Sequence, residues 1–198
     1  MRKPKIHELI EAIKAIFRGP YTTKFPAEPC EPPEEFRGKP EYHEDDCVGC
    51  GTCSKVCPAG AIDLTDDTDR KIRTLTIRYD NCIFCGTCEA NCITEKGILL
   101  SNEFDLTTTD RGTLRQSIEK ELVLCEACGA IVGTRDHILW TAERLGPLAF
   151  ANPTLLLTSL QNLNLAAEVP KPSAPMLRRG DRVRILCPKC KQVTSFLA

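Results

Sequence analysis

The spacing of the cysteines constrains this chain more than any other feature. Twelve of its thirteen cysteines fall in close runs, and Cys30 stands apart. Two runs have the form C-x-x-C-x-x-C-x-x-x-C, with each cysteine recurring 35 positions later, and two C-x-x-C pairs follow. The runs are Cys47, Cys50, Cys53 and Cys57, then Cys82, Cys85, Cys88 and Cys92, and the pairs are Cys125 with Cys128 and Cys187 with Cys190. With only 42% hydrophobic residues, the chain is expected to need bound metal to hold part of its fold.

Each four-cysteine run has the spacing of bacterial 4Fe–4S ferredoxins. Three closely spaced thiolates wrap one cluster, and the fourth points away to ligate the other. Zinc sites take four ligands in pairs, so zinc fits these runs poorly. We therefore expect one cluster on Cys47, Cys50, Cys53 and Cys92, and a second on Cys82, Cys85, Cys88 and Cys57.

The two C-x-x-C pairs predict a separate metal site. Cys125, Cys128, Cys187 and Cys190 have the paired spacing of zinc ribbons. A single iron is the alternative, because a Cys-Pro-x-Cys knuckle also suits rubredoxin-like sites. Such a site would staple a segment that lacks a large core of its own.

Composition and charge exclude several classes of protein. The formal net charge of −1 gives no general attraction to nucleic acid, and the small arginine cluster at 178–184 does not change that. No apolar run approaches the roughly 20 residues that span a bilayer. The N-terminus lacks the apolar core of a signal peptide, so we expect a reducing intracellular compartment.

The chain is expected to be an α+β protein in three parts. Residues 1–46 predict an amphipathic helix over 1–18 followed by a proline-rich docking strap. Residues 47–104 form the repeated two-cluster domain, in which Arg73–Tyr79 alternates like a strand. Residues 105–198 form a zinc-ribbon-like or rubredoxin-like extension with a helical insertion. Its expected elements are helices over His137–Leu145 and from Asn152 onward, a loop over Val169–Pro175 and a strand over Arg182–Leu186.

Local sequence around the cysteines resembles a known family. The stretches Tyr21–Pro26, Phe36–Pro40 and Asn81–Gly86 are similar to the two-cluster ferredoxin-like subunit of respiratory complex I and the energy-converting membrane hydrogenases. The resemblance covers roughly residues 1–104. The two knuckle pairs resemble the longer variant of formate hydrogenlyase and other group 4 nickel–iron hydrogenase complexes. There are departures, since Ile93 replaces the usual proline after Cys92 and the segment that follows is one residue longer.

The resemblance implies a role as an electron relay. It implies that the subunit carries electrons between an outer iron–sulfur subunit and the small catalytic subunit. It also implies that the N-terminal helix lies along a membrane arm, on the cytoplasmic side of the membrane. Four thiolates per cluster leave no open position, so we expect no small-molecule substrate site in this chain. The alternatives are a stand-alone soluble ferredoxin and, less favoured, a zinc-ribbon binding or redox-sensing protein.

Overall fold

The computed structural model describes residues 6–19, 22–33, 35–166 and 183–196. The expected loop over Val169–Pro175 and most of the arginine cluster lie outside these residues. The chain divides into two units, Met1–Phe36 and Arg37–Ala198. None of the described helices is both long and apolar enough to cross a membrane.

The first unit contains helix α1 (Ile6–Arg18), as the amphipathic pattern predicted. Gly19 ends the helix in a left-handed conformation, and its amide donates to the Ala15 carbonyl at 3.0 Å. None of the helix residues is buried. The apolar face therefore remains exposed, with its members Ile6, Leu9, Ile10, Ile13, Ile16 and Phe17.

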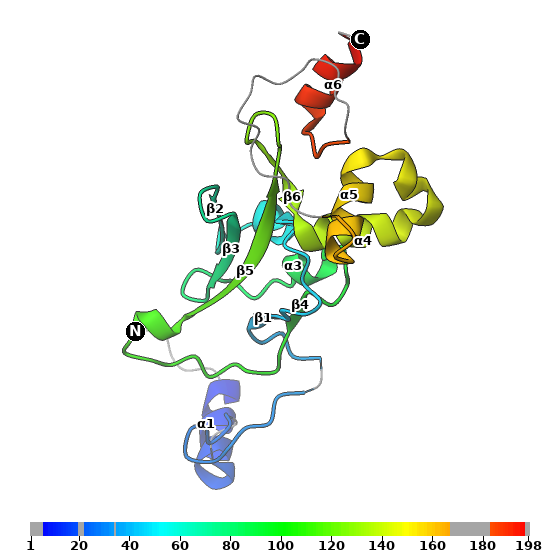
Figure 1. Cartoon of the computed structure of the whole chain (residues 1–198). Helices are drawn as coiled ribbons and strands as arrows, with labels where there is room; N and C mark the ends of the chain where they lie inside the picture. Colours follow the sequence, from blue (N-terminus) through cyan, green and yellow to red (C-terminus); the bar gives the residue numbers. More distant parts are fainter. Residues whose placement is uncertain (1–5, 20–21, 34, 167–182, 197–198) are drawn as a thin grey trace. The chain divides into compact units, whose positions relative to one another are not determined.

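The second unit is built on two antiparallel sheets. Strands β1 (Pro40–Tyr42) and β4 (Ile98–Leu100) form the smaller sheet, with Tyr42 opposite Ile98. The larger sheet has the order β2-β3-β5-β6, and its longest strand, β5, is shown in Figure 1. Its strands are β2 (Ile62–Asp67), β3 (Ile72–Arg78), β5 (Arg115–Leu124) and β6 (Ile131–Thr134).

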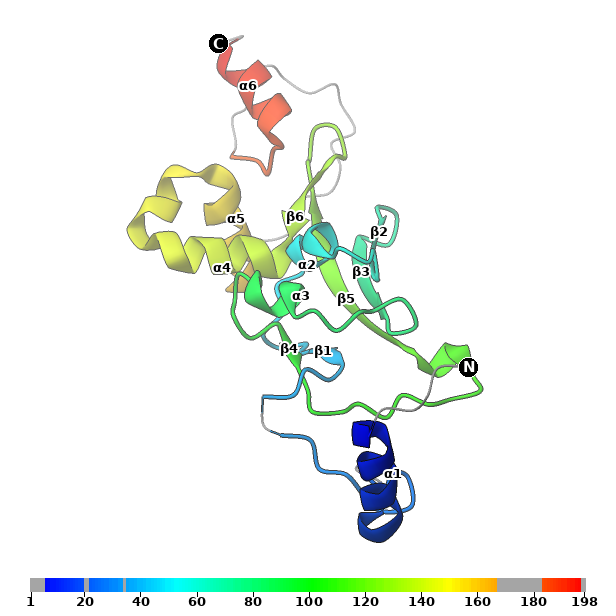
Figure 2. The same cartoon turned by 180° about the vertical axis from the view of Figure 1, so that it is seen from behind.

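Five helices and two 3₁₀ turns complete the described part of the second unit. Three of these helices carry a cysteine each, and α4 and α5 pack against each other (Figure 2). The Asn152 side chain caps α5 by accepting from the Thr154 amide at 3.1 Å, as its position before Pro153 predicted. The elements are α2 (Thr52–Val56), α3 (Thr87–Ala90), η1 (Arg111–Thr113), α4 (Arg135–Leu145), η2 (Gly146–Ala151), α5 (Pro153–Asn162) and α6 (Pro188–Phe196).

The expected mixed α+β class is confirmed, and three local expectations change. Strand β1 lies inside the predicted strap but pairs with β4 of the same chain. Strand β5 belongs to the predicted extension but pairs along the whole of β3. The strand expected over Arg182–Leu186 is wrong for the described residues 183–186, which are not in a sheet. Instead the Ile185 amide donates to the Glu126 carboxylate at 3.1 Å, and the Ile185 carbonyl accepts from the Glu126 amide at 2.9 Å.

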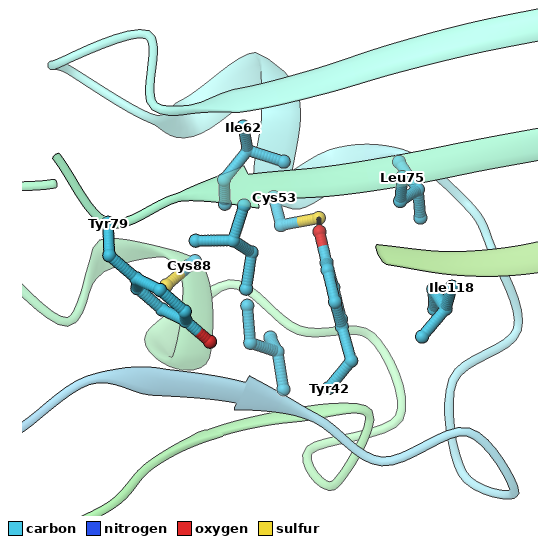
Figure 3. Close-up of a cluster of buried hydrophobic side chains, with 9 residues drawn as sticks. Tyr42, Cys53, Ile62, Leu75, Tyr79, Cys88 and Ile118 are labelled. Carbon is cyan, nitrogen blue, oxygen red and sulfur yellow. Dashed lines mark hydrogen bonds between the residues drawn. The ribbon is translucent and has the colours of Figure 1, made fainter. Parts of the chain in front are cut away.

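Two cores lie on different parts of this unit. The main core joins both sheets and contains Tyr42, Leu75, Ile77 and two cysteines, Cys53 and Cys88 (Figure 3). A smaller core lies under α4 and α5, around Ile138, Ala142, Ala149 and Leu155. The main core therefore includes the third cysteine of each four-cysteine run.

Candidate iron–sulfur and metal sites

The eight cysteines of the two runs line two separate cavities. Each cavity contains three cysteines of one run and the last cysteine of the other. The first cavity is lined by Cys47, Cys50, Cys53 and Cys92. The second is lined by Cys57, Cys82, Cys85 and Cys88. The structure therefore brings together the same two sets of four that the crossed ligand assignment predicts.

Equivalent turns position the cysteines in both halves. Gly51 and Gly86 have φ values of 80° and 76°, in the left-handed region, and each precedes a short helix that carries the buried third cysteine. A Cβ at Gly51 would lie 2.5 Å from Leu64 Cδ1, so the end of the Leu64 side chain would have to shift, and the positive φ would add backbone strain. After α2 the backbone of Cys57 becomes extended, which directs this last cysteine to the second cavity.

Burial disfavours the free thiolate at four of the eight cysteines, two in each cavity. It raises the pKa of Cys47 to about 11 and that of Cys88 to about 11. Burial also raises the pKa values of Cys53 and Cys82. Since a ligating sulfur is a thiolate, such buried sulfurs need positive charge beside them, which the iron of a cluster supplies. The donor set and its apolar surroundings therefore fit 4Fe–4S clusters.

Hydrogen-bond donors surround the sulfurs. The Ala61 amide donates to Cys57 Sγ at 3.3 Å, and the Phe84 amide donates to Cys82 Sγ at 3.4 Å. Such bonds help to set the reduction potential of a cluster. Four hydroxyl oxygens also lie close to cysteine sulfurs. In the first cavity, the Oγ1 atoms of Thr52 and Thr94 each lie 3.3 Å from sulfur, at Cys50 and Cys92, and the Tyr42 hydroxyl lies 3.5 Å from Cys53 Sγ. In the second cavity, Thr87 Oγ1 lies 3.2 Å from Cys85 Sγ.

The first cysteine loop, residues 47–53, is braced by side chains from the larger sheet. The buried Thr134 hydroxyl donates to the Val48 carbonyl, and Arg73 Nη1 donates to the Gly49 carbonyl at 3.1 Å. Lys120 Nζ donates to the Glu44 carbonyl, just before the loop, at 2.7 Å. Neither Thr134 nor Lys120 was expected from the sequence, because nothing in their local pattern indicates a partner about 80 residues away.

The four remaining paired cysteines form a tighter group. The sulfurs of Cys125, Cys128, Cys187 and Cys190 all lie within 4.8 Å of one another, and those of Cys128 and Cys187 are 3.7 Å apart. A tetrahedral ion with metal–sulfur bonds of about 2.3 Å requires sulfurs about 3.8 Å apart, so this group fits a single ion. In the described part of the chain, the cysteines of the two cavities form no such close group.

The four-cysteine group joins the β5–β6 turn to the start of α6. The Cys125 amide donates to the Ala130 carbonyl at 2.8 Å, which shapes the turn. Burial acts to raise the pKa of Cys125, but backbone amides that include those of Cys187 and Cys128 lower it to about 7. These amides stabilise the thiolate and so favour metal binding. Cys30, in the first unit, is half-buried and forms no disulfide.

Comparison with known proteins agrees with this site. The model of the 4Fe-4S dicluster domain family matches residues 29–96. The chain is 37% identical over 116 residues to formate hydrogenlyase subunit 6 of Escherichia coli, covering 58% of this chain and 63% of that protein. It is 31% identical over 143 residues to the chloroplastic NAD(P)H-quinone oxidoreductase subunit I of Acorus calamus, covering 68% of this chain and 74% of that protein.

Other matches span a smaller share of the relatives. The alignment with the chloroplastic subunit I of Citrus sinensis is 38% identical and covers 49% of this chain and 60% of that protein. Among solved structures, a chain of the membrane-bound sulfane sulfur reductase, an archaeal respiratory membrane complex, is 31% identical. That match has a TM-score of 0.41 and covers 58% of this chain and 61% of the other. The sequence matches show that the chain belongs to the family of 4Fe–4S dicluster subunits that includes NAD(P)H-quinone oxidoreductase subunit I and formate hydrogenlyase subunit 6.

Proposed function

We propose that this chain relays single electrons through two 4Fe–4S clusters inside a membrane-associated oxidoreductase complex. The observation that carries the proposal is the pair of cavities, each lined by four cysteines drawn from both runs. Clusters bound there would supply one-electron transfer. Four cysteines around each leave no position for substrate, so the chain acts as a carrier and the chemistry of the complex takes place elsewhere.

The proposed ligands follow the lining of the cavities. One cluster is held by Cys47, Cys50, Cys53 and Cys92, and the other by Cys82, Cys85, Cys88 and Cys57. The third site, on Cys125, Cys128, Cys187 and Cys190, holds zinc, with a single iron as the alternative. This third site ties the C-terminal helix to the β5–β6 turn, and it has a structural role in the proposal.

The proposed partners are an outer iron–sulfur subunit, a small iron–sulfur catalytic subunit and a membrane arm. Two features support membership of a complex over a freely diffusing ferredoxin. The apolar face of α1 is exposed, with Phe17 86% accessible, which suits contact with the membrane arm. The extension built on β5 and β6 also goes beyond what two clusters need. We place the chain on the cytoplasmic side of the membrane, as a peripheral subunit.

Anaerobic purification from its own cells tests the relay. We expect about eight irons, from two clusters of four, one zinc, and co-purifying iron–sulfur and membrane subunits. The same metals in a lone chain that exchanges electrons with many partners would instead support a soluble ferredoxin. Zinc in place of most of the iron would overturn the two-cluster proposal.

Paired serine variants test the crossed ligands. In Cys57→Ser, the affected cluster should be the one held by the second run, Cys82–Cys88. In Cys92→Ser, it should be the one held by the first run, Cys47–Cys53. Electron paramagnetic resonance (EPR) of the reduced protein separates these outcomes. The ligand assignment is contradicted if Cys57→Ser alters the same cluster as Cys50→Ser.

A further inference from the structure

The two cavities differ in the hydroxyl groups that reach their sulfurs. One contact is common to both, since Thr52 and Thr87 occupy equivalent positions beside Cys50 and Cys85. Among the described residues, the other hydroxyl contacts to these sulfurs lie in the first cavity. Its additional hydroxyls come from Tyr42, at Cys53, and Thr94, at Cys92.

The repeat explains why Tyr42 has no equivalent in the second cavity. Thirty-five residues after Tyr42 stands Ile77, and both are buried. Tyr42 lines the first cavity and Ile77 lines the second. The buried sulfur of Cys53 therefore faces a hydroxyl, as Figure 3 shows, whereas an isoleucine occupies the corresponding position in the cavity that contains Cys88.

The backbone holds Tyr42 firmly in this position. Tyr42 pairs with Ile98 across the small sheet. Its amide donates to Gln116 Oε1 at 2.9 Å, and Gln116 Nε2 donates to its carbonyl at 3.4 Å. These contacts do not involve the phenol oxygen, so removal of the hydroxyl leaves the attachment of the strand intact.

We propose that the Tyr42 hydroxyl donates a hydrogen bond to the Cys53 thiolate and makes the cluster of the first cavity easier to reduce than that of the second. This inference rests on the proposed function. A ligating thiolate has no proton, so the phenol must be the donor. One-electron reduction adds negative charge to the cluster and its sulfurs, and an O–H dipole directed at sulfur stabilises that charge. Burial strengthens the effect, because little water screens it.

Thr94 acts in the same direction at the fourth ligand of the first cavity. Its hydroxyl lies 3.3 Å from Cys92 Sγ, and it also accepts a hydrogen bond from the Gly97 amide at 3.0 Å. The equivalent position after Cys57 is Ala59, which has no hydroxyl. At equilibrium the relay would therefore hold its electron at the first cavity more often than at the second.

Redox titration followed by EPR tests this inference on the anaerobically purified protein with both clusters. Cys50→Ser identifies the signal of the first-cavity cluster. In Tyr42→Phe, we expect the equilibrium constant for reduction of the first-cavity cluster to fall about fivefold, which corresponds to the loss of one typical hydrogen bond. At about 59 mV per tenfold change, this is a fall of about 40 mV. The equilibrium constant for reduction of the second-cavity cluster should stay unchanged.

Tyr79→Phe is the matched control. Tyr79 belongs to the same core, but its single O–H proton is shared between the Pro40 carbonyl at 2.9 Å and Gln116 Oε1 at 3.2 Å and is not directed at sulfur. In Tyr79→Phe, Gln116 keeps its bonds to the amide and carbonyl of Tyr42. This variant should leave both potentials unchanged. The inference is overturned if Tyr42→Phe shifts neither potential or both, or if Tyr79→Phe produces the same shift.

A second variant covers the case in which Tyr42→Phe does not retain its clusters. A fluorinated tyrosine at position 42 keeps the ring and is a stronger donor, so it should raise the potential of the first-cavity cluster. No change, or a fall, would overturn the inference. Failure of the proposed function is distinguishable, because the unmodified protein would then lack two 4Fe–4S signals altogether.

Discussion

The two cysteine loops share one backbone design but differ in their surroundings. Residues 47–53 lie under β5 and β6, and Val48 is 9% exposed, whereas its counterpart in the second loop, Ile83, is 62% exposed. Thr134 and Arg73 bond to carbonyls of the first loop. A repeated motif can therefore keep its ligand geometry while one copy becomes part of a core and the other faces outward.

The largest expected effect comes from Gly49, which has a positive φ, as does its counterpart in the second loop. Gly49 has φ +67°, and a Cβ there would lie 3.0 Å from Lys120 and 3.1 Å from Thr134. We expect Gly49→Ala to lower the free energy of local opening by about 2–5 kcal/mol, from about 1–2 of backbone cost and about 1–3 of crowding. Hydrogen exchange of the loop amides measures this.

Phe84 provides the control for that change. It stands 35 positions after Gly49 and already has φ +53° with a β-carbon. Phe84→Ala keeps that β-carbon, so it should add no backbone cost at the second loop. Equal losses of protection in the two loops would contradict the difference in bracing.

The next effect concerns the hydroxyl that bonds to the first loop. Thr134→Val keeps the shape of the side chain but leaves the buried Val48 carbonyl without its donor. The cost should be about 1–3 kcal/mol, measured as protection of amides in residues 47–53. Thr158→Val is matched, since Thr158 is equally buried but bonds to Thr154 within its own helix. Its effect should be smaller and should not reach the loop.

A smaller effect separates the apolar residues after the first cysteine of each run. Val48→Ala removes two buried methyl groups, so it should cost about 1.5 kcal/mol at about 0.8 each. Ile83→Ala removes more side chain but from an exposed position, and should stay within about 0.5 kcal/mol. Denaturation of the purified holoprotein compares the two. A larger cost for Ile83→Ala would contradict the difference in burial between the two loops.

The smallest expected effect is a dependence of thermal stability on pH that comes from His137. Burial, together with the positive charge of Arg73, lowers the pKa of His137 in α4. As the pH falls, the imidazole of His137 is therefore protonated in the unfolded chain before it is protonated in the folded chain. The contribution of neutral His137 to stability is complete above about pH 6.5 and declines as the pH falls below that value. His137→Gln should flatten this decline in thermal stability between about pH 6.5 and 5. Identical slopes in the two proteins would contradict the prediction.

The cysteines that line each cavity are the sets that the sequence spacing predicted, because the spacing of cysteines within a run is local and strict. Strand β3 was also predictable, since Leu75 and Ile77 alternate toward the core. Strand β5 was missed because its buried or half-buried side includes the polar residues Gln116 and Lys120. These two bond to the backbone of Tyr42 and Glu44, and such long-range partners leave no pattern in the nearby sequence.

The same reasoning explains what was missed in the extension. Helix α6 begins within the last knuckle, at Pro188, and no helix was predicted there from the sequence. A strand was predicted over Arg182–Leu186, but in the described residues 183–186 the backbone of Ile185 bonds to the side chain and the amide of Glu126 and not to a strand. Alternation of apolar and polar residues indicates an extended backbone, but it does not show which groups form hydrogen bonds with that backbone.

The exchange of the last cysteine between the cavities also bears on how such a domain is inherited. Each four-cysteine run contributes its last cysteine to the cavity of the other run. Separation of the chain between Cys57 and Cys82 would therefore leave each cavity with three cysteines. Neither half is a module that recombination can pass on alone. Mutations in either run must then be compatible with both cavities, and we expect the two cavities to be retained or lost together in evolution.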